Sequence, residues 1–489
     1  MSTLPTGLDR AALARVPADA RPLVEPGALR PRVLHLGLGA FHRAHQAVYT
    51  ERAAAATGEP WGIAVVAPRS ADTAAALRVQ DCLWSVTERG AAGGRTYVVG
   101  SVVDALALVP DAARVDALLA DPDVAVVTLT ITEKGHHRRP DGSLDTADPA
   151  IAADLAAGPD EARTVVGRLA AGLAARMRAG AAPLSVVSCD NMSANGTALA
   201  AVVRGFVEAS SWPDRDRVLD RMAEAVTFPS TIVDRIVPAT TDADREAAAA
   251  ALGVADALPV VGEPYRQWVL EDRFAGPRPA WERDGALLVP DVAPYQLTKL
   301  RLLNGAHSAL AYLGLAAGAT TIADAMATGW GETLVRTLAA EVAPTLPADG
   351  PDPVVYAADL VERFRNPGIR HLLRQIGSDG SLKVPERWLP VLRERLRGTG
   401  ESPVLELALA GWVHATRPGP GGGQLFGTTD PAAEALAARW HGAGSPARLE
   451  ATVRGLLDAI GAPDLAATDG LVRAVATRLP ALAAGRVEL

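Results

Sequence analysis

The sequence contains few cysteines and no excess of positive charge. Only Cys82 and Cys189 occur in 489 residues, and neither belongs to a CxxC pair, so we expect neither a disulfide framework nor a zinc knuckle. Lysine and arginine together number 48 against 56 acidic residues, which gives a formal net charge of −8. This acidic balance argues against non-specific binding to nucleic acid and gives no reason to expect an anionic membrane as a partner.

Long apolar runs are also missing. The first residues, MSTLPTGLDRAALARV, lack the apolar stretch of a signal peptide. The longest apolar runs, such as VAVVTLTI at 124–131, are far too short to cross a bilayer. We therefore expect a cytoplasmic protein.

What the sequence does have is enough apolar material for more than one core. A length of 489 residues with 49% hydrophobic residues suits two large domains. Near residue 290 the alternation of short apolar and helical segments gives way to long segments with helical periodicity. We therefore predict one domain over 1–290 and a second over 291–489.

The first part alternates short apolar segments with helical segments rich in Ala, Leu and Arg. We expect strands at 33–36, 61–70, 124–131 and 183–191, and one further strand within TYVVGSVVDALAL at 96–108. Such alternation predicts an α/β domain of the Rossmann type, with a parallel sheet covered by helices on both faces. Ligands of such sheets bind at the carboxyl ends of the strands, where GLGAFHR, TEKG and SCDN occur.

The part after residue 290 has helical periodicity in KLRLLNGAHSALAYLGLAAG, PVVYAADLVERFRN and DPAAEALAARWHGAG. We predict a mainly α-helical C-terminal domain. The glycine-rich segment at 419–424 is interpreted as a surface turn.

A candidate phosphate loop follows the first expected strand. Gly37 and Gly39 match a GxGxx pattern, in which one glycine permits a tight turn and the other lets the backbone approach a pyrophosphate. His42 stands where the dinucleotide fingerprint has a third glycine, and a simple tight turn is the alternative. The second strand should end in an acid for the adenosine ribose, but Asp72 comes late and Arg69 could meet a 2′-phosphate. Since Arg69 could equally be an exposed loop arginine, the choice between NAD and NADP stays open.

A helical segment after residue 297 carries Lys299, Asn304 and His307. At ~100° per residue, Asn304 lies about 140° and His307 about 80° from Lys299, so the three can share one side of a helix. Burial would lower the pKa of a lysine toward neutrality, as a general base for a secondary alcohol requires. Asn304 could donate to a developing alkoxide, and His307 could orient a hydroxyl. The alternative is a lysine that reaches solvent and an ordinary core histidine.

The motifs together resemble the long-chain mannitol dehydrogenase family, which includes mannitol 2-dehydrogenase, fructuronate reductase (mannonate oxidoreductase) and arabinitol dehydrogenases. The matching segments run in order from about residue 31 to almost 390: GLGAFHRAHQ, TITEKG, SCDNMSANG, FPSTIVDRIVPAT, GEPYRQWVLEDRF, KLRLLNGAHS, RFRNP and DGSLKVP.

This resemblance implies metal-independent hydride transfer with NAD, NADP not being excluded. It implies Lys299 as general base, Asn191 and Asn304 as a pair that polarises the carbonyl oxygen, and His307 as a ligand of a substrate hydroxyl. Asp234 would line the site, although an ordinary ion pair with Arg235 is the alternative. The residues expected at the dinucleotide are Val33, Gly37, Leu38, Gly39, Ala40, Phe41, His42, Arg43, Ala44 and Arg69.

The chain departs from the family in two places. Gln296 stands where relatives often have a glutamate three residues before the lysine, and it cannot titrate, so the resemblance leaves the proton route and the pH profile of this chain open. His136 and His137 follow TEKG, where relatives often have a tyrosine directly after the glycine.

Two positions bear on the substrate. Lys134 replaces the glycine typical of mannitol dehydrogenases, and its ammonium could meet a substrate carboxylate, whereas a surface pair with Glu133 is the alternative. Gln375, eight residues before Lys383, stands where mannitol enzymes tend to have arginine. With Gln375 and Lys383 expected at the substrate, the resemblance favours reduction of D-fructuronate to D-mannonate over a mannitol 2-dehydrogenase or related polyol activity. The partner is thus a small sugar acid or polyol, and the sequence leaves the oligomeric state open, a monomer included.

Two other classes of function would use parts of the same sequence. His42 and His45 at HxxH spacing, with His136 and His137, could suggest a metalloenzyme, but no carboxylate or cysteine completes a set nearby, and no metal is expected. A non-catalytic nucleotide-binding regulator could use the same fold. A mere sensor would not need Lys299 together with its asparagine and histidine partners.

Overall fold

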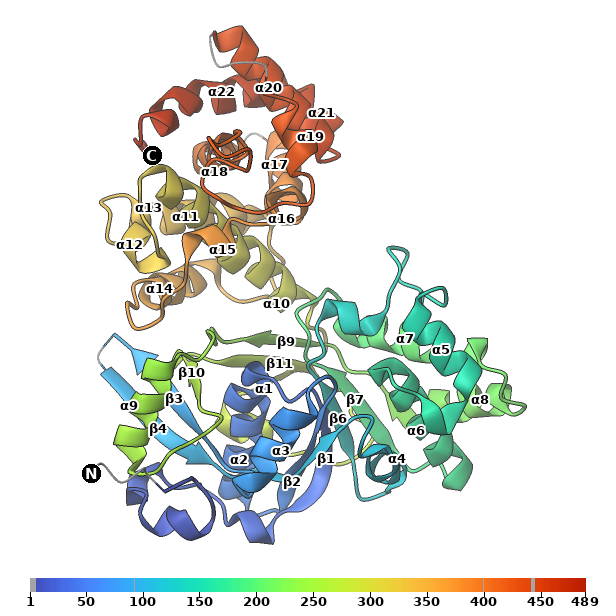
Figure 1. Cartoon of the computed structure of the whole chain (residues 1–489). Coiled ribbons are helices and arrows are strands. Elements are labelled where there is room, and N and C mark those ends of the chain that lie inside the picture. Colours follow the sequence, from blue (N-terminus) through green and yellow to red (C-terminus); the bar gives the residue numbers. More distant parts are fainter. Residues whose placement is uncertain (1–5, 92, 399, 441–444) are drawn as a thin grey trace. The chain divides into compact units, whose positions relative to one another are not determined.

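The structure is a computed structural model that describes residues 6–91, 93–398, 400–440 and 445–489. The chain divides into two compact units, Met1–Val292 and Ala293–Leu489, coloured blue to yellow-green and yellow to red in Figure 1. Within the described residues, no helix combines the length and the apolar character needed to cross a membrane.

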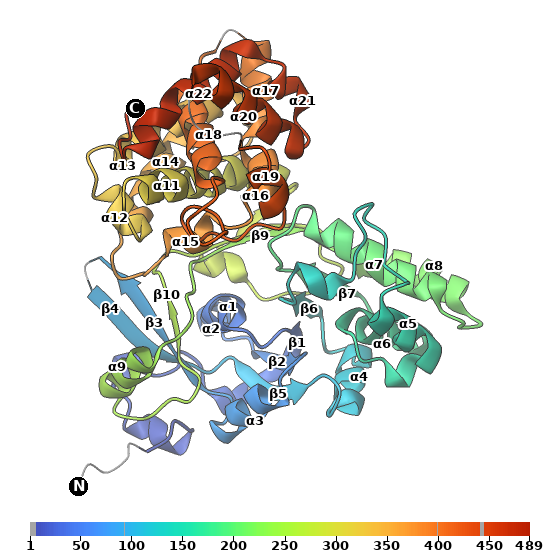
Figure 2. The ribbon, with the colours of Figure 1, turned by 45° about the horizontal axis from the view of Figure 1, so that its top comes forward.

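A six-stranded sheet forms the centre of the N-terminal unit, and all of its pairings are parallel. Its order is β5-β2-β1-β6-β7-β8, and the strands from β5 to β7 follow one another in Figure 2. Numbered along the chain, this order is 3-2-1-4-5-6, which is that of dinucleotide-binding Rossmann folds. The strands are β1 (Arg30–Leu36), β2 (Trp61–Ala67), β5 (Val102–Ala107), β6 (Val126–Leu129), β7 (Leu184–Ser188) and β8 (Val226–Thr227).

Helices cover both faces of this sheet. Leu34 and Leu36 of β1 belong to one hydrophobic cluster, and Val33 of the same strand belongs to another. Since successive side chains of a strand point to opposite faces, each face has its own core. The helices of the unit are α1 (Ala40–Ala44), α2 (Gln46–Thr57), α3 (Ala71–Val79), α4 (Ala112–Ala120), α5 (Pro149–Ala157), α6 (Val165–Ala179), α7 (Asn195–Ala209), α8 (Arg215–Ala225) and α9 (Asp242–Leu252).

Two three-stranded sheets complete the unit: β10-β3-β4 and β12-β11-β9. Their strands are β3 (Trp84–Gly90), β4 (Gly93–Val99), β9 (Thr231–Asp234), β10 (Val260–Gly262), β11 (Gln267–Glu271) and β12 (Leu287–Val289).

The single strand expected over 96–108 is wrong. The segment forms parts of β4 and β5, which belong to different sheets. The chain breaks between them because the Gly100 N–H donates to Glu51 and the Ser101 hydroxyl donates to the Ala47 carbonyl. A side chain at Gly100 would also lie 2.9 Å from Pro26.

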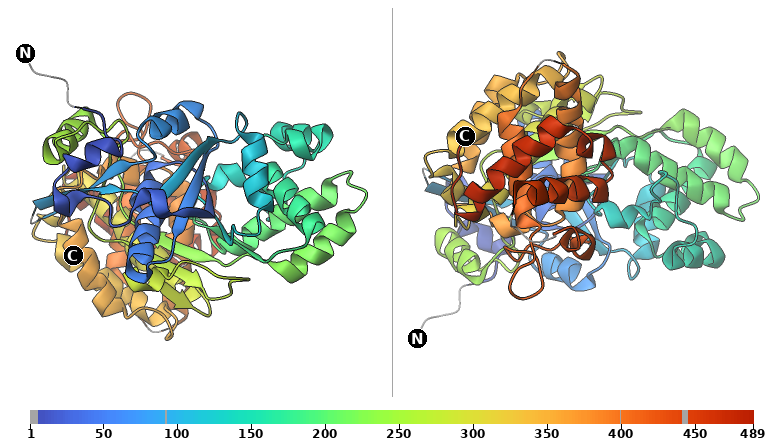
Figure 3. Two further views of the ribbon diagram at one scale, coloured as in Figure 1. Left: turned by 90° about the horizontal axis from the view of Figure 1, so that it is seen from below. Right: turned by 90° about the horizontal axis from the view of Figure 1, so that it is seen from above.

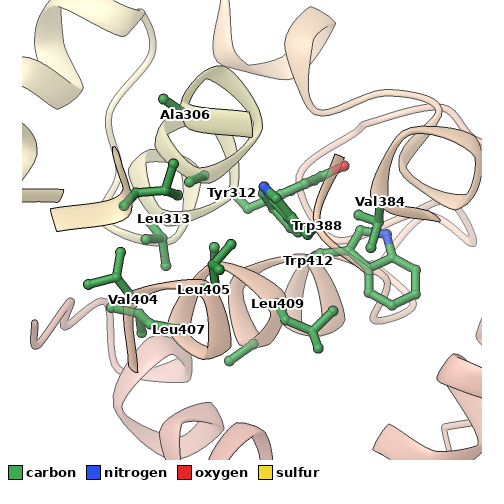
Figure 4. Close-up of a cluster of buried hydrophobic side chains, with 14 of the residues drawn as sticks. Ala306, Tyr312, Leu313, Val384, Trp388, Val404, Leu405, Leu407, Leu409 and Trp412 are labelled. Atoms are coloured by element: carbon green, nitrogen blue, oxygen red, sulfur yellow. The ribbon is translucent and has the colours of Figure 1, made fainter. Parts of the chain in front are cut away.

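The C-terminal unit is mainly helical, and the right-hand view of Figure 3 looks onto its orange and red helices. Part of its core lies between α11 and α18, where Tyr312, Leu313, Leu405 and Trp412 belong to one hydrophobic cluster (Figure 4). The helices are α10 (Ala293–Thr298), a π-helix (Lys299–Asn304), α11 (Gly305–Ala316), α12 (Ile322–Met326), α13 (Gly331–Val342), α14 (Pro353–Phe364), α15 (Leu373–Ile376), α16 (Gly380–Arg387), α17 (Leu389–Arg397), α18 (Pro403–Ala415), α19 (Ala433–Ala437), α20 (Pro446–Ala459), α21 (Pro463–Ala466) and α22 (Asp469–Ala483). The expected fold class, a Rossmann-type domain with a mainly helical C-terminal domain, is confirmed.

Candidate active site

The glycine turn between β1 and α1 has the geometry that a dinucleotide loop needs. Gly37 has φ +135°, and a Cβ there would lie 2.3 Å from the Thr130 carbonyl oxygen, so only glycine fits. At Gly39 a Cβ would meet nothing within 4 Å, so the backbone is open to an approaching ligand. Gly37 thus permits the tight turn, and Gly39 leaves the backbone accessible to a ligand.

This turn opens onto a pocket of about 460 Å³ within the N-terminal unit. The pocket lies at the carboxyl ends of β1, β2, β5 and β6, which include the point where the strand order reverses. Its lining residues are Gly37, Leu38, Gly39, Ala67, Pro68, Arg69, Ser70, Thr73, Leu108, Thr130, Ile131, Thr132, Lys134, Gly135, His137, Arg163, Thr164 and Val165.

The lining of the pocket is basic. Arg69, Lys134 and Arg163 all reach it, and no aspartate or glutamate does. Within the described part of the chain, the structure gives the side chains of these three residues no hydrogen bond or ion pair. The first turn of α6, capped by Thr164, adds backbone N–H groups at the same wall. The pocket therefore suits an anionic ligand, and the pyrophosphate of a dinucleotide fits it.

The structure separates the predicted dinucleotide residues into two groups. Gly37, Leu38, Gly39 and Arg69 line the pocket, and Ala40 and Phe41 are half-buried beside it at the start of α1. Four others are buried behind the turn: Val33, His42, Arg43 and Ala44.

His42 stands at the position of the third glycine of the fingerprint and packs against the central sheet. Its ring stacks on that of His35 in β1, with centroids 3.4 Å apart and planes at 12°. Burial, with the neighbouring basic groups, lowers the pKa of His42 well below its ordinary value, so the ring is neutral at physiological pH. His45 is hydrogen-bonded to the Gln267 carbonyl at 2.8 Å. Among the described residues, no group of three or more His, Cys, Asp or Glu side chains could hold a metal ion.

A buried carboxylate that sequence reasoning missed joins two of the strand ends. Asp190, after β7, accepts from the Thr132 N–H at 2.7 Å and bonds to His136 Nε2 at 2.7 Å. Thr132 has φ +66° and ψ 161°, a conformation that is strained for a residue with a side chain. These bonds hold the loop that carries Lys134 at the rim of the pocket. The only signal in the sequence was the presence of Asp190 within SCDN.

Asn191 and Asp234 also follow or end strands of the N-terminal unit. Asn191 is exposed directly after Asp190, and Asp234 is buried at the end of β9. The neighbouring Arg235 donates to Glu88 at 2.8 Å and to the carbonyls of Ala44 and Glu263. Arg235 therefore has a structural role that does not depend on Asp234.

In the C-terminal unit, the predicted catalytic segment begins with a π-helix over Lys299–Asn304, whereas the sequence predicted an α-helix there. The Gly305 N–H donates to the Leu300 carbonyl, five residues earlier. A bond of this span brings residues i and i+5 closer to one face than in an α-helix, and so it aligns Asn304 with Lys299 better than the expected 140°. Lys299 and Asn304 are half-buried.

Arg387 of α16 and the next residue, Trp388, stabilise the π-helix through hydrogen bonds. Arg387 donates to the Asn304 carbonyl at 3.1 Å and to Ser308 Oγ at 2.7 Å. The Trp388 indole donates to the Gly305 carbonyl at 3.2 Å. These hydrogen bonds give partners to carbonyl groups that a π-helix leaves poorly paired, and they thereby stabilise the π-helix.

His307 lies in the first turn of α11 and is 8% exposed. Phe364 stacks on its ring with centroids 4.4 Å apart. Burial is the main cause that lowers its pKa well below the ordinary value, and the basic groups of His371, Arg363, Arg387 and Lys299 lower it further. His307 is therefore a neutral imidazole in a strongly basic environment.

Two predicted substrate residues lie elsewhere in the C-terminal unit. The Lys383 ammonium donates to the carbonyls of Ile376 and Ser378 at 3.2 and 2.6 Å, where it caps the end of α15. Gln375 is exposed on α15. Neither is among the groups whose charges or rings act on His307.

Comparison with known proteins matches both units. A model of the mannitol dehydrogenase Rossmann domain matches residues 31–283, and a model of the mannitol dehydrogenase C-terminal domain matches residues 291–483. The D-mannonate oxidoreductase of Escherichia coli (strain K12) is 39% identical over 422 residues, which cover 84% of this chain and 85% of that protein.

Two solved structures are similar over almost their whole length. A D-sorbitol dehydrogenase in substrate-free form has a TM-score of 0.86 and 28% identity, covering 98% of this chain and 100% of the other. The Pseudomonas fluorescens mannitol 2-dehydrogenase, in a ternary complex with NAD and D-mannitol, has a TM-score of 0.79 and 32% identity, covering 98% and 97%. The expected family and class of enzyme are confirmed: the chain is an oxidoreductase of the mannitol dehydrogenase family.

Proposed function

We propose that the protein interconverts D-fructuronate and D-mannonate, with NAD as the hydride carrier. The observation that carries the choice of an acidic substrate is the set of basic side chains around His307: Lys299, Arg363 and Arg387. A neutral polyol gains little from such a set, whereas a carboxylate gains charge-assisted hydrogen bonds. The similarity to a D-mannonate oxidoreductase supports the same substrate class.

The pocket of the N-terminal unit is the proposed dinucleotide site. Gly37 and Gly39 leave room for the pyrophosphate, and Arg69, Lys134 and Arg163 supply positive charge. When bound, the dinucleotide supplies or accepts the hydride. NAD is proposed because the related mannitol 2-dehydrogenase was solved with it. The position of Lys134 in this pocket favours contact with the cofactor's phosphates over the substrate carboxylate that the sequence suggested.

Proton transfer is assigned to Lys299. During reduction its ammonium gives a proton to the carbonyl oxygen as the hydride reaches the carbonyl carbon, and during oxidation the amine takes that proton back. Asn304 donates an N–H group to this oxygen and stabilises its developing charge. His307, held by Phe364, binds a substrate hydroxyl. Gln296 cannot titrate, so the proton of Lys299 does not pass through position 296.

Oxidation of a polyol such as mannitol is the second candidate, because the chain is similar to mannitol 2-dehydrogenase over 98% of its length. A steady-state comparison on the purified protein, with D-fructuronate and D-fructose as substrates and NADH as reductant, separates the two. We expect a kcat/KM at least tenfold higher for fructuronate, which is ~1.4 kcal/mol of transition-state stabilisation. A clearly higher value for fructose would refute the proposed substrate.

A further inference from the structure

His371 lies at a fixed position beside His307. Its N–H donates to the Ile369 carbonyl and its carbonyl accepts from the Ile322 N–H, both at 3.0 Å. The next residue, Leu372, forms an isolated β-bridge with Thr321. The backbone is therefore tied down on both sides of His371, which fixes the point from which its side chain extends.

The two imidazoles meet edge to face. Their centroids are 4.9 Å apart and their planes lie at 87°. Phe364 stacks on the His307 ring at 30° and keeps that imidazole in place. Together, His307, His371 and Phe364 form a small aromatic cluster next to the π-helix.

Each imidazole of this cluster has a buried nitrogen without a hydrogen-bond partner. These atoms are Nε2 of His307 and Nδ1 of His371. Buried polar atoms of native proteins are nearly always satisfied, and those left open often await a ligand or a water. Burial lowers the pKa of both rings, with Arg363 contributing in each case. A neutral imidazole can donate or accept a hydrogen bond, which suits hydroxyl groups.

We propose that His371 is a substrate-binding residue that acts with His307, the two unpaired nitrogens holding two oxygen atoms of the substrate's polyhydroxy chain. The inference rests on the proposed function, since it assumes an open-chain sugar acid or sugar as the substrate. It adds a specificity residue outside the lysine, asparagine and histidine set.

His371→Ala tests this inference, with His371→Asn as the conservative variant and His414→Ala as the control. His414 is a buried histidine of α18 that also meets an aromatic ring, that of Phe426 at 5.5 Å, and it stands outside the proposed site. We expect His371→Ala to raise KM for fructuronate about five- to tenfold, as loss of one hydrogen bond would, with kcat changed less than about threefold. His371→Asn should recover part of the loss, and His414→Ala should leave KM within about twofold of the wild type.

A KM for His371→Ala that equals that of the wild type, or that shifts only as much as in His414→Ala, would overturn the role of His371. If His371→Ala does not fold, as judged by its melting temperature, the same comparison is made with His371→Asn and His371→Gln. Failure of the proposed function is seen separately, because the wild-type protein would then reduce fructose more efficiently than fructuronate or would reduce neither substrate.

Discussion

Replacement of Lys134 by alanine distinguishes a cofactor contact from a substrate contact. Lys134 is exposed, has no partner within the described chain, and lines the same pocket as Gly37, Gly39 and Arg69. An ammonium about 5 Å from a phosphate charge gains about 3 kcal/mol at an effective dielectric constant of 20 and about 1 kcal/mol in water. Because the side chain is exposed, the lower figure applies, which corresponds to about a fivefold change in affinity.

We therefore expect Lys134→Ala to raise KM for NADH about fivefold with every carbonyl substrate, whereas Lys134→Arg keeps the charge and stays near the wild type. The assay is steady-state reduction of fructuronate and of fructose at varied NADH, with NADH binding measured separately by fluorescence. A KM for NADH that does not change, together with a rise in KM for fructuronate alone, would contradict this reasoning. That result would instead assign Lys134 to the substrate carboxylate.

Three further predictions follow from charged groups outside the catalytic set. Burial raises the pKa of Glu51 from 4.5 to about 7, so the stability that its protonated form contributes is complete below pH 4.5 and is lost as the pH rises through 7. Thermal melts should therefore show the wild type losing stability relative to Glu51→Gln between pH 5 and 8. Parallel curves of melting temperature against pH for the two proteins would contradict this. Asp190→Ala leaves the buried His136 Nε2 and the Thr132 N–H without a hydrogen-bond partner, which costs about 1–3 kcal/mol of folding stability for each group. The variant should therefore have a lower melting temperature and a higher KM for NADH. An unchanged KM would show that the loop carrying Lys134 keeps its place without the carboxylate. Salt should raise KM for NADH between about 50 and 500 mM because it screens the basic pocket, and a salt-independent KM would argue against phosphate contacts there.

The architecture of the N-terminal unit was predictable because local pattern and tertiary structure agree there. Apolar runs such as Trp61–Ala67 are buried on both faces, as the strands of a covered parallel sheet must be. The break at Gly100 was not predictable, because it depends on a contact with Glu51 in a distant helix. Apolar composition alone does not reveal which strand joins which sheet.

The site was predictable in kind and less so in detail. The glycine turn and the segment from Lys299 to His307 were visible as motifs. The π-helix was not, because it depends on Arg387 and Trp388, more than 80 residues away, to satisfy its carbonyls. His371 escaped notice for a similar reason: nothing in its neighbouring sequence indicates that its ring meets His307.

The central claim is that Lys299 transfers the proton, and the variant Lys299→Ala tests it most directly. The measurement is fructuronate reduction by NADH at saturating substrate, combined with NADH binding to the same variant. We predict that turnover falls at least a hundredfold while the Kd for NADH stays within about threefold of the wild type, since general acid–base groups contribute about 10²–10⁴-fold. Turnover within tenfold of the wild type, with intact NADH binding, would contradict the assignment of Lys299.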